Sequence, residues 1–286
     1  MRWKRGHTGG IEDRRAQGGT GGFGMGGLGS GGGILVVVIL VIALQFLGGG
    51  GSGSIGTGLE GLAGGAGQPA HSVDLTNDGD MVEFMGYVLD DANDLWADTF
   101  DRAGQAYTPT RLVLFTGSTM SGCGQASSAT GPFYCPADQK VYVDLEFFEE
   151  LKRRFGAPGD FAQAYVLAHE VGHHVQTLTG IEAQVRQVQQ QDPGQANALS
   201  VKMELQADCL AGVWAQAVFE QGDLEAGDID EALGAASAVG DDRIQASAGG
   251  RVNPETWTHG SAEQRSQWFN TGYRTGDPAA CDTFGG

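Results

Sequence analysis

The stretch His169-Glu170-Val171-Gly172-His173 governs how the rest of this 286-residue sequence is interpreted. On a helix, residues four apart lie on one face, so the imidazoles of His169 and His173 can bind a single metal ion. Glu170 lies beside them as a carboxylate that can act as a general base. Two neutral imidazoles, a free carboxylate and a third ligand are what a zinc peptidase requires. The motif therefore predicts a Zn²⁺ site carried by a helix.

The residues around the motif favour a helix with one buried side. Residues 161–178 contain no proline, and their apolar side chains recur at three- and four-residue spacing, which predicts a core-facing stripe. The two histidines fall outside this stripe, so we expect them to face a cleft. The alternative is a pair of surface histidines beside a solvated glutamate. The stripe consists of Ala164, Leu167, Ala168, Val171, Val175 and Leu178.

The third zinc ligand is expected from a second helix. A third histidine after a glycine turn, as in metzincins, is ruled out because Gln176 and Thr179 occupy those positions. Residues 197–219 predict an amphipathic helix that carries Glu204 and, one turn later, Asp208. Glu204 is the expected ligand, and Asp208 is placed to accept a hydrogen bond from a ligating histidine and so orient its ring. A solvated helix face is the alternative interpretation of both carboxylates.

Five short segments are specific enough to compare with known families. They are residues 169–174 (HEVGHH), 204–209 (ELQADC), 121–124 (SGCG), 131–136 (GPFYCP) and 258–261 (THGS). Together they resemble the putative neutral zinc metallopeptidase family of bacterial membrane-anchored proteins, over most of the chain from residue 75 to residue 285. The resemblance implies a zincin-like fold and peptidase activity. The family's arrangement is similar to that of thermolysin-like gluzincins, which implies that Glu204 is the third ligand and Asp208 its outer partner.

The remaining patterns predict an α+β fold, a small sheet followed by a mostly helical C-terminal half. In zincins a sheet edge lines the cleft, and substrate peptides commonly add to such an edge as an extra strand. We expect residues 141–144 to form that edge. Strands are predicted over residues 111–116 and 140–145, and further helices over 81–100, 146–155, 228–246 and 261–270.

The first 72 residues differ in composition from the rest. Residues 1–33 are rich in glycine and basic, with five of the 17 Lys and Arg, and are expected to be flexible and cytoplasmic. Residues 34–47 (ILVVVILVIALQFL) carry no charge, and the flanking glycines extend this run enough to cross a bilayer. We predict a single transmembrane anchor there, a glycine-rich linker over 48–72, and an extracytoplasmic peptidase domain over 73–286. A cleaved signal peptide and a buried core helix are the alternatives for the apolar run.

The net charge bears on the partners of the domain. The chain carries a formal charge of −18 at pH 7 although its amino-terminal segment is basic, so the remainder is strongly acidic. An acidic surface repels a phosphate backbone, which argues against nucleic acid as a partner. The expected partners are a peptide or protein substrate and the membrane.

All four cysteines lie in the predicted extracytoplasmic domain. Cys123 and Cys135 bracket a loop rich in Gly, Ser and Pro, which predicts a disulfide-closed loop. Cys209 and Cys281 would then pair and connect the C-terminal tail to the helix that carries Glu204. An even number of cysteines fits an oxidising compartment, although four cysteines allow three connectivities. A cysteine zinc site is disfavoured because no Cys-x-x-Cys occurs.

His259 is a further candidate for the catalytic site. It lies in a turn before a predicted helix, and zinc peptidases usually add a hydrogen-bond donor that stabilises the developing oxyanion. The alternative is a surface or packing histidine. The leading hypothesis is a membrane-anchored zinc peptidase with Glu170 as general base. Two others stay open: an inactive zincin-fold module that binds metal or a partner, and a structural zinc site completed by His174 or His259.

Overall fold

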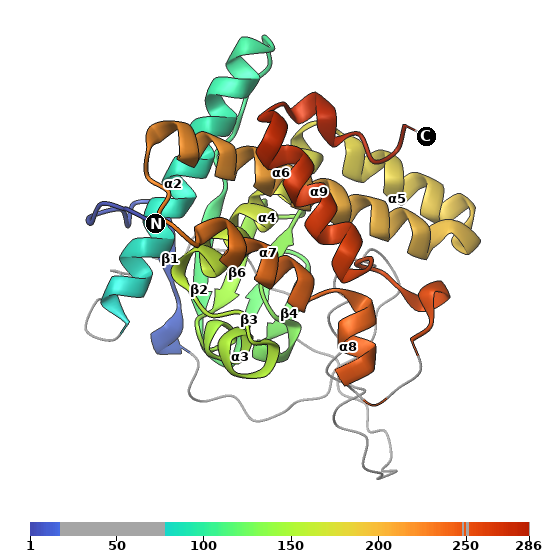
Figure 1. Cartoon of the computed structure of the whole chain (residues 1–286), viewed down its shortest axis with the longest axis horizontal. Coiled ribbons are helices and arrows are strands. Elements are labelled where there is room, and N and C mark those ends of the chain that lie inside the picture. The colour runs from blue at the N-terminus through green and yellow to red at the C-terminus, as the bar shows by residue number, and fades with distance from the viewer. Residues whose placement is uncertain (18–77, 248, 250–251, 286) are drawn as a thin grey trace, which may run out of the picture.

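The computed structural model of the chain describes residues 1–17, 78–247, 249 and 252–285. Its main sheet has four strands in the order β1-β2-β6-β5 (Figure 1). The strands β1, β2 and β6 run parallel, and β5 pairs antiparallel with β6. The strands β3 and β4 lie between β2 and β5 in the sequence and pair with each other in a separate antiparallel hairpin. The strands are β1 Ile11–Asp13, β2 Arg111–Phe115, β3 Ser118–Ser121, β4 Gly124–Ser127, β5 Phe133–Cys135 and β6 Lys140–Asp144.

The edge of the sheet beside the metal-motif helix is β5 and not β6. The expectation that residues 141–144 form this edge is wrong, because β6 lies between β2 and β5 and its backbone is paired on both sides. Buried Val141, Tyr142 and Val143 are the continuous apolar run that an internal strand needs. The strand β5 escaped sequence analysis because it is only three residues long and lies inside the loop between Cys123 and Cys135.

Helices make up most of the chain after the sheet, which confirms the α+β fold with a mostly helical C-terminal half. The expected helix over 228–246 is two helices, because the chain turns at Gly240. A Cβ added at Gly240 would lie 2.3 Å from the backbone nitrogen of Ala262, so the turn needs glycine. The helices are α2 Gly79–Arg102, α3 Glu146–Phe155, α4 Asp160–Leu178, α5 Ile181–Gln191, α6 Ala196–Gln221, α7 Asp228–Ala238, α8 Asp241–Ser247 and α9 Ala262–Thr275.

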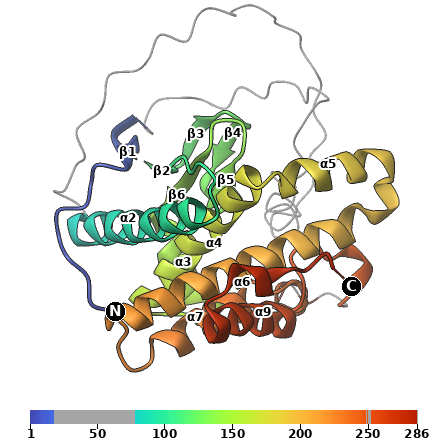
Figure 2. The ribbon, with the colours of Figure 1, turned by 90° about the horizontal axis from the view of Figure 1, so that it is seen from above.

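Helix α4 lies at the centre of the described domain. It contacts α2, β5 and β6 on one side and α6 and α7 on the other, as Figure 2 shows from above. Fifteen of its 19 residues are buried, so the histidine face is covered by α6 instead of facing open solvent. Gly172 has no side chain, which makes room for α6. A Cβ there would lie 3.1 Å from the Cα of Ala207.

Both predicted disulfides are present. Cys123 is bonded to Cys135 and Cys209 to Cys281, with Cα atoms 5.8 Å and 5.5 Å apart. The second bond connects the C-terminal 3-10 turn, Pro278–Cys281, to the middle of α6. It therefore fastens the tail of the chain one residue away from Asp208.

Residues 1–17 are folded against the domain, which differs from the flexible segment expected over residues 1–33. The strand β1 extends the sheet by pairing with β2, and Ile11 is buried in the core. The ring of Trp3 packs edge-on against Phe84 of α2 at a centroid distance of 5.6 Å. The high glycine content of this region predicted flexibility. The three-residue strand and the aromatic contact could not be predicted from it, because both need partners in the folded domain.

Two further contacts fix the path of this segment. The amino group of Met1 lies 3.0 Å from a carboxylate oxygen of Asp160, the first residue of α4. The carbonyl oxygen of His7 lies directly over Gly86 of α2, where an added Cβ would come within 1.5 Å of it. The segment thus follows a route that α2 leaves open only because Gly86 has no side chain.

The predicted transmembrane anchor (residues 34–47) and linker (residues 48–72) lie outside the described residues. Among the residues that are described, no helix is both long and apolar enough to cross a membrane.

Candidate metal centre

Helices α4 and α6 bring the three predicted ligands together. One nitrogen from each of His169 and His173 and one oxygen of Glu204 all lie within 4.8 Å of one another. The Nε2 atom of His169 is 3.2 Å from Oε2 of Glu204, and that of His173 is 3.6 Å from Oε1. The two rings stand almost perpendicular, with centroids 4.8 Å apart. Helical i and i+4 spacing supplies the two imidazoles, and the packing of α6 supplies the carboxylate.

The arrangement of donors fits a zinc ion. His169 directs Nδ1 to Asp208 at 2.9 Å, and His173 directs Nδ1 to the side-chain oxygen of Gln176 at 2.8 Å. These acceptors place a proton on Nδ1 of each ring, so Nε2, which faces Glu204, is the atom of each ring that would bind the ion. Ligands at about 2.05 Å in a tetrahedron are separated by about 3.3 Å. The separations of 3.2 Å and 3.6 Å, which run to different oxygens of Glu204, are close to that spacing.

The two glutamates of the site have opposite electrostatic environments. Burial opposes the charge of Glu204, but His173 and the hydrogen bond from His169 outweigh burial and hold the pKa of Glu204 below its usual range. Burial raises the pKa of Glu170, and the neighbouring histidines and a backbone hydrogen bond from Tyr134 offset this only in part. One carboxylate is therefore kept as an anion, while the other is tuned to take up a proton.

Asp208 lies beside the ring of His169, as predicted, and makes further hydrogen bonds that were not predicted. It is fully buried, and its Oδ1 accepts hydrogen bonds from His169 and from the hydroxyl of Tyr165, which lies 2.5 Å away. Arg265 of α9 donates to both of its oxygens. In the protein without metal, burial opposes a charge on His169, but Asp208 and Glu204 raise the pKa of His169 to about 10. Sequence analysis missed Tyr165 and Arg265, because neither stands at a ligand-like spacing.

His259 is buried and held by Asp241, a residue that sequence analysis did not select. Its Nδ1 lies 3.0 Å from Oδ1 of Asp241. The other oxygen of Asp241 accepts the backbone N–H groups of Thr258, His259 and Gly260, which fixes the turn. His259 also lowers the pKa of Glu204, though less than burial raises it and less than His173 lowers it. The imidazole is therefore not on the surface, while a packing role, the other alternative, fits these contacts.

His174 has a structural position. It is completely buried, its Nδ1 lies 2.9 Å from the hydroxyl of Tyr134, and its Nε2 lies 2.6 Å from the carbonyl oxygen of Thr108. Both ring nitrogens are therefore used in contacts that hold α4 to β5 and to the loop before β2. This geometry disfavours the hypothesis in which His174 completes a structural zinc site.

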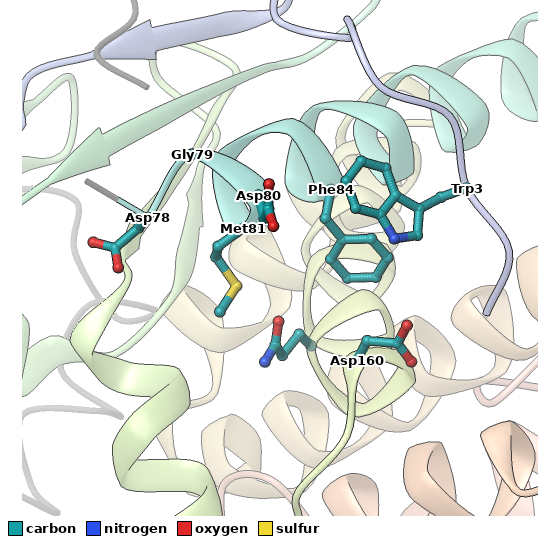
Figure 3. A pocket seen from close by; sticks show the side chains of 8 residues that line it. Trp3, Asp78, Gly79, Asp80, Met81, Phe84 and Asp160 are labelled. Carbon is teal, nitrogen blue, oxygen red and sulfur yellow. The ribbon is translucent and has the colours of Figure 1, made fainter. Parts of the chain in front are cut away.

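A pocket of about 610 Å³ lies apart from the ligand trio, between the starts of α2 and α4 (Figure 3). Trp3 and Phe84 line one part of it, and Asp80 and Asp160 add acidic groups. None of the predicted site residues lines this pocket. Its chemistry therefore does not bear on the metal centre.

Two imidazoles and a carboxylate on packed helices, with a second carboxylate beside them, form a group that could hold a metal ion. The family comparison agrees: the sequence model described as "Putative neutral zinc metallopeptidase" matches residues 1–284, and the chain belongs to this family. It is 50% identical to "Uncharacterized protein YpfJ" of Escherichia coli strain K12 over 236 residues, 80% of this chain and 82% of that protein. It is 51% identical to "Uncharacterized protein Rv2575" of Mycobacterium tuberculosis over 189 residues, 62% and 63% of the two chains. No solved structure matches the chain.

Proposed function

We propose that the protein is a zinc-dependent peptidase in which Glu170 acts as general base. The observation that carries this proposal is the position of Glu170. It is buried next to His169 and His173, its pKa is raised by burial, and the ligand trio is complete without it. A site that served only to bind metal would not need a second carboxylate tuned to accept a proton.

The side chains have distinct roles in this mechanism. His169, His173 and Glu204 would hold the ion, and a bound zinc ion supplies a Lewis acid that polarises the scissile carbonyl and makes water more acidic. Glu170 takes a proton from the attacking water and delivers it to the leaving amine. His259, oriented by Asp241, donates a hydrogen bond to the oxygen on which negative charge develops.

The sheet edge beside the metal-motif helix supports a proposal for the substrate class. The strand β5 contacts α4, and the backbone of Tyr134 in this strand reaches Glu170. A peptide that adds to β5 as a further strand would bring its carbonyl groups past the general base. We therefore assign an extended peptide or an unfolded protein segment as the substrate.

A membrane anchor over residues 34–47 would have to be reconciled with the pairing of β1 and β2. A single crossing between residues 17 and 78 would place β1 and β2 on opposite sides of the membrane, whereas the two strands are paired here. An anchor over residues 34–47 with a cytoplasmic amino terminus is therefore compatible only with a detached β1.

The proposal is tested by comparing the full chain with its Glu170→Gln variant. We expect one zinc per chain in both proteins, and cleavage of an unfolded protein such as reduced, alkylated casein by the unchanged chain alone. Loss of a general base should lower kcat by about 10²–10⁴-fold. Glu263→Gln, which makes the same change at an exposed position of α9, is the control.

Two results would count against this mechanism. Full activity in the Glu170→Gln variant would exclude Glu170 as the base. Stoichiometric zinc without cleavage by the unchanged chain would favour the inactive metal-binding module over the peptidase.

A further inference from the structure

Arg265 is the buried cation of the metal centre. Only 3% of its surface is exposed, and its Nε and Nη2 atoms lie 2.8 Å and 2.9 Å from the two oxygens of Asp208. Nη2 is also 3.2 Å from the hydroxyl of Tyr165. It lies 4.0 Å from the carboxylate of Glu204. The guanidinium thus makes a two-point contact with the residue that orients His169, and this geometry is specific to arginine.

The helix that presents Arg265 is held rigidly against α6. A Cβ added at Gly212 of α6 would lie 2.1 Å from the carbonyl oxygen of Phe269, and one at Gly272 would lie 1.8 Å from that of Cys209. These glycines let the two backbones touch within the turn of α6 that follows Asp208. Ser261 caps the start of α9. The position of the guanidinium is therefore set by helix packing and not by a flexible surface side chain.

We propose that Arg265 is a positioning residue of the zinc site, which holds Asp208 so that Asp208 fixes the ring of His169 for metal binding. The inference rests on the proposed zinc site at His169, His173 and Glu204, but not on peptidase activity. In this chain of contacts, Arg265 fixes both oxygens of Asp208, and Asp208 fixes Nδ1 of His169. The opposite nitrogen of that ring then faces Glu204.

The charge of Arg265 and its geometry predict opposite effects on zinc affinity. A cation near Glu204 repels Zn²⁺, so charge alone predicts that the Arg265→Gln variant binds zinc more tightly. Positioning predicts weaker binding, because an unrestrained Asp208 no longer fixes His169. The sign of the change in affinity therefore distinguishes the two roles.

The experiment measures zinc affinity of the full chain by competition with a chromogenic chelator at constant pH. We expect Arg265→Gln to weaken zinc binding by about 10–100-fold, the range found when an outer partner of a metal ligand is removed. The Asp208→Asn variant should show a similar loss, and the double variant should lose little more than either alone, because both act through one contact. Arg243→Gln removes an exposed arginine from neighbouring α8 and should leave the affinity unchanged.

A conservative variant keeps the inference testable if Arg265→Gln fails to fold. Arg265→Lys retains the charge but cannot make the two-point contact, so we expect it also to bind zinc more weakly than the unchanged chain. Wild-type affinity in a folded Arg265→Gln or Arg265→Lys variant, or tighter binding in either, would overturn the positioning role. A shift in melting temperature without a change in affinity would do the same.

Failure of this inference is separable from failure of the proposed function. If His169→Ala abolishes zinc binding while Arg265→Gln does not alter it, only the role of Arg265 is wrong. If zinc binding depends on Arg265 but no peptide is cleaved, the peptidase proposal fails and the positioning role stands.

Discussion

The metal centre and the amino-terminal segment, residues 1–17, reach the core of the domain in different ways. The centre is built from residues at short, fixed spacing on two helices, so its members can be recognised one turn apart in the sequence. The segment is held by contacts with partners about 80 to 230 residues away, among them Phe84, Leu112 and Asp228. Residues one turn apart on a helix are neighbours wherever that helix packs. A docked strand, by contrast, needs partner residues from distant parts of the chain.

The two regions meet at α4. The amino group of Met1 contacts Asp160 at the first residue of this helix, and His169 lies nine residues further along it. The comparison therefore raises a specific question: whether the docked segment serves only stability, or also the metal site. Three predictions test the metal centre, the docked segment and the link between them, ordered from the largest expected effect to the smallest.

The largest effect is expected from Glu204→Ala. Removing a direct ligand should weaken zinc binding by more than the roughly 100-fold upper limit of an outer partner. Zinc content of the purified chain, measured by atomic emission, checks this prediction. Glu220→Ala on the exposed end of α6 is the matched control. Stoichiometric zinc that is indifferent to Glu204 would mean that the third ligand is misassigned.

An intermediate effect is expected from Gly86→Ala, which targets the amino-terminal segment alone. The added Cβ would overlap the carbonyl oxygen of His7, so the segment must shift or detach. We expect the free energy of unfolding to fall by about 1–3 kcal/mol, as for other overpacked sites, with zinc affinity unchanged. Urea denaturation measures the first quantity and chelator competition the second.

The control for this change is Gly234→Ala, in α7, where an added Cβ meets nothing within 4 Å. That variant should gain about 0.5–1 kcal/mol, because alanine is the better helix former. A Gly86→Ala protein as stable as the unchanged chain would show that the segment is not docked as described. A parallel loss of zinc would show that the two regions are coupled through α4.

The last prediction is that labelling at two positions, one in the amino-terminal segment and one in the domain, should not differ. Single cysteines placed at exposed Lys4 and exposed Asp230 should react equally with a membrane-impermeant thiol reagent in intact cells, because β1 and the domain form one body. Labelling of the cysteine at position 230 alone, with the one at position 4 labelled only after lysis, would contradict the docked segment in the cell. That result would support the single-pass anchor with a cytoplasmic amino terminus.

Much of the site could be predicted because its geometry is local. The pair His169 and His173 follows from helical periodicity. Two histidines leave zinc one protein ligand short, which directed the search to Glu204, and Asp208 lies one turn further along the same predicted helix. Arg265 and Asp241 could not be found in this way. Their side chains reach the site from α9 and α8, and nothing in their sequence neighbourhood marks a buried arginine or an orienting aspartate.

The sequence by itself predicted the histidine pair and the α+β order of elements, because each depends on spacing along one element or on composition. It left three possible disulfide connectivities. Only the tertiary structure decided that β5 is the edge beside the site, that residues 1–17 complete the sheet, and that Arg265 joins the metal centre. These three features depend on contacts between segments far apart in the chain, which close packing selects and no local pattern encodes.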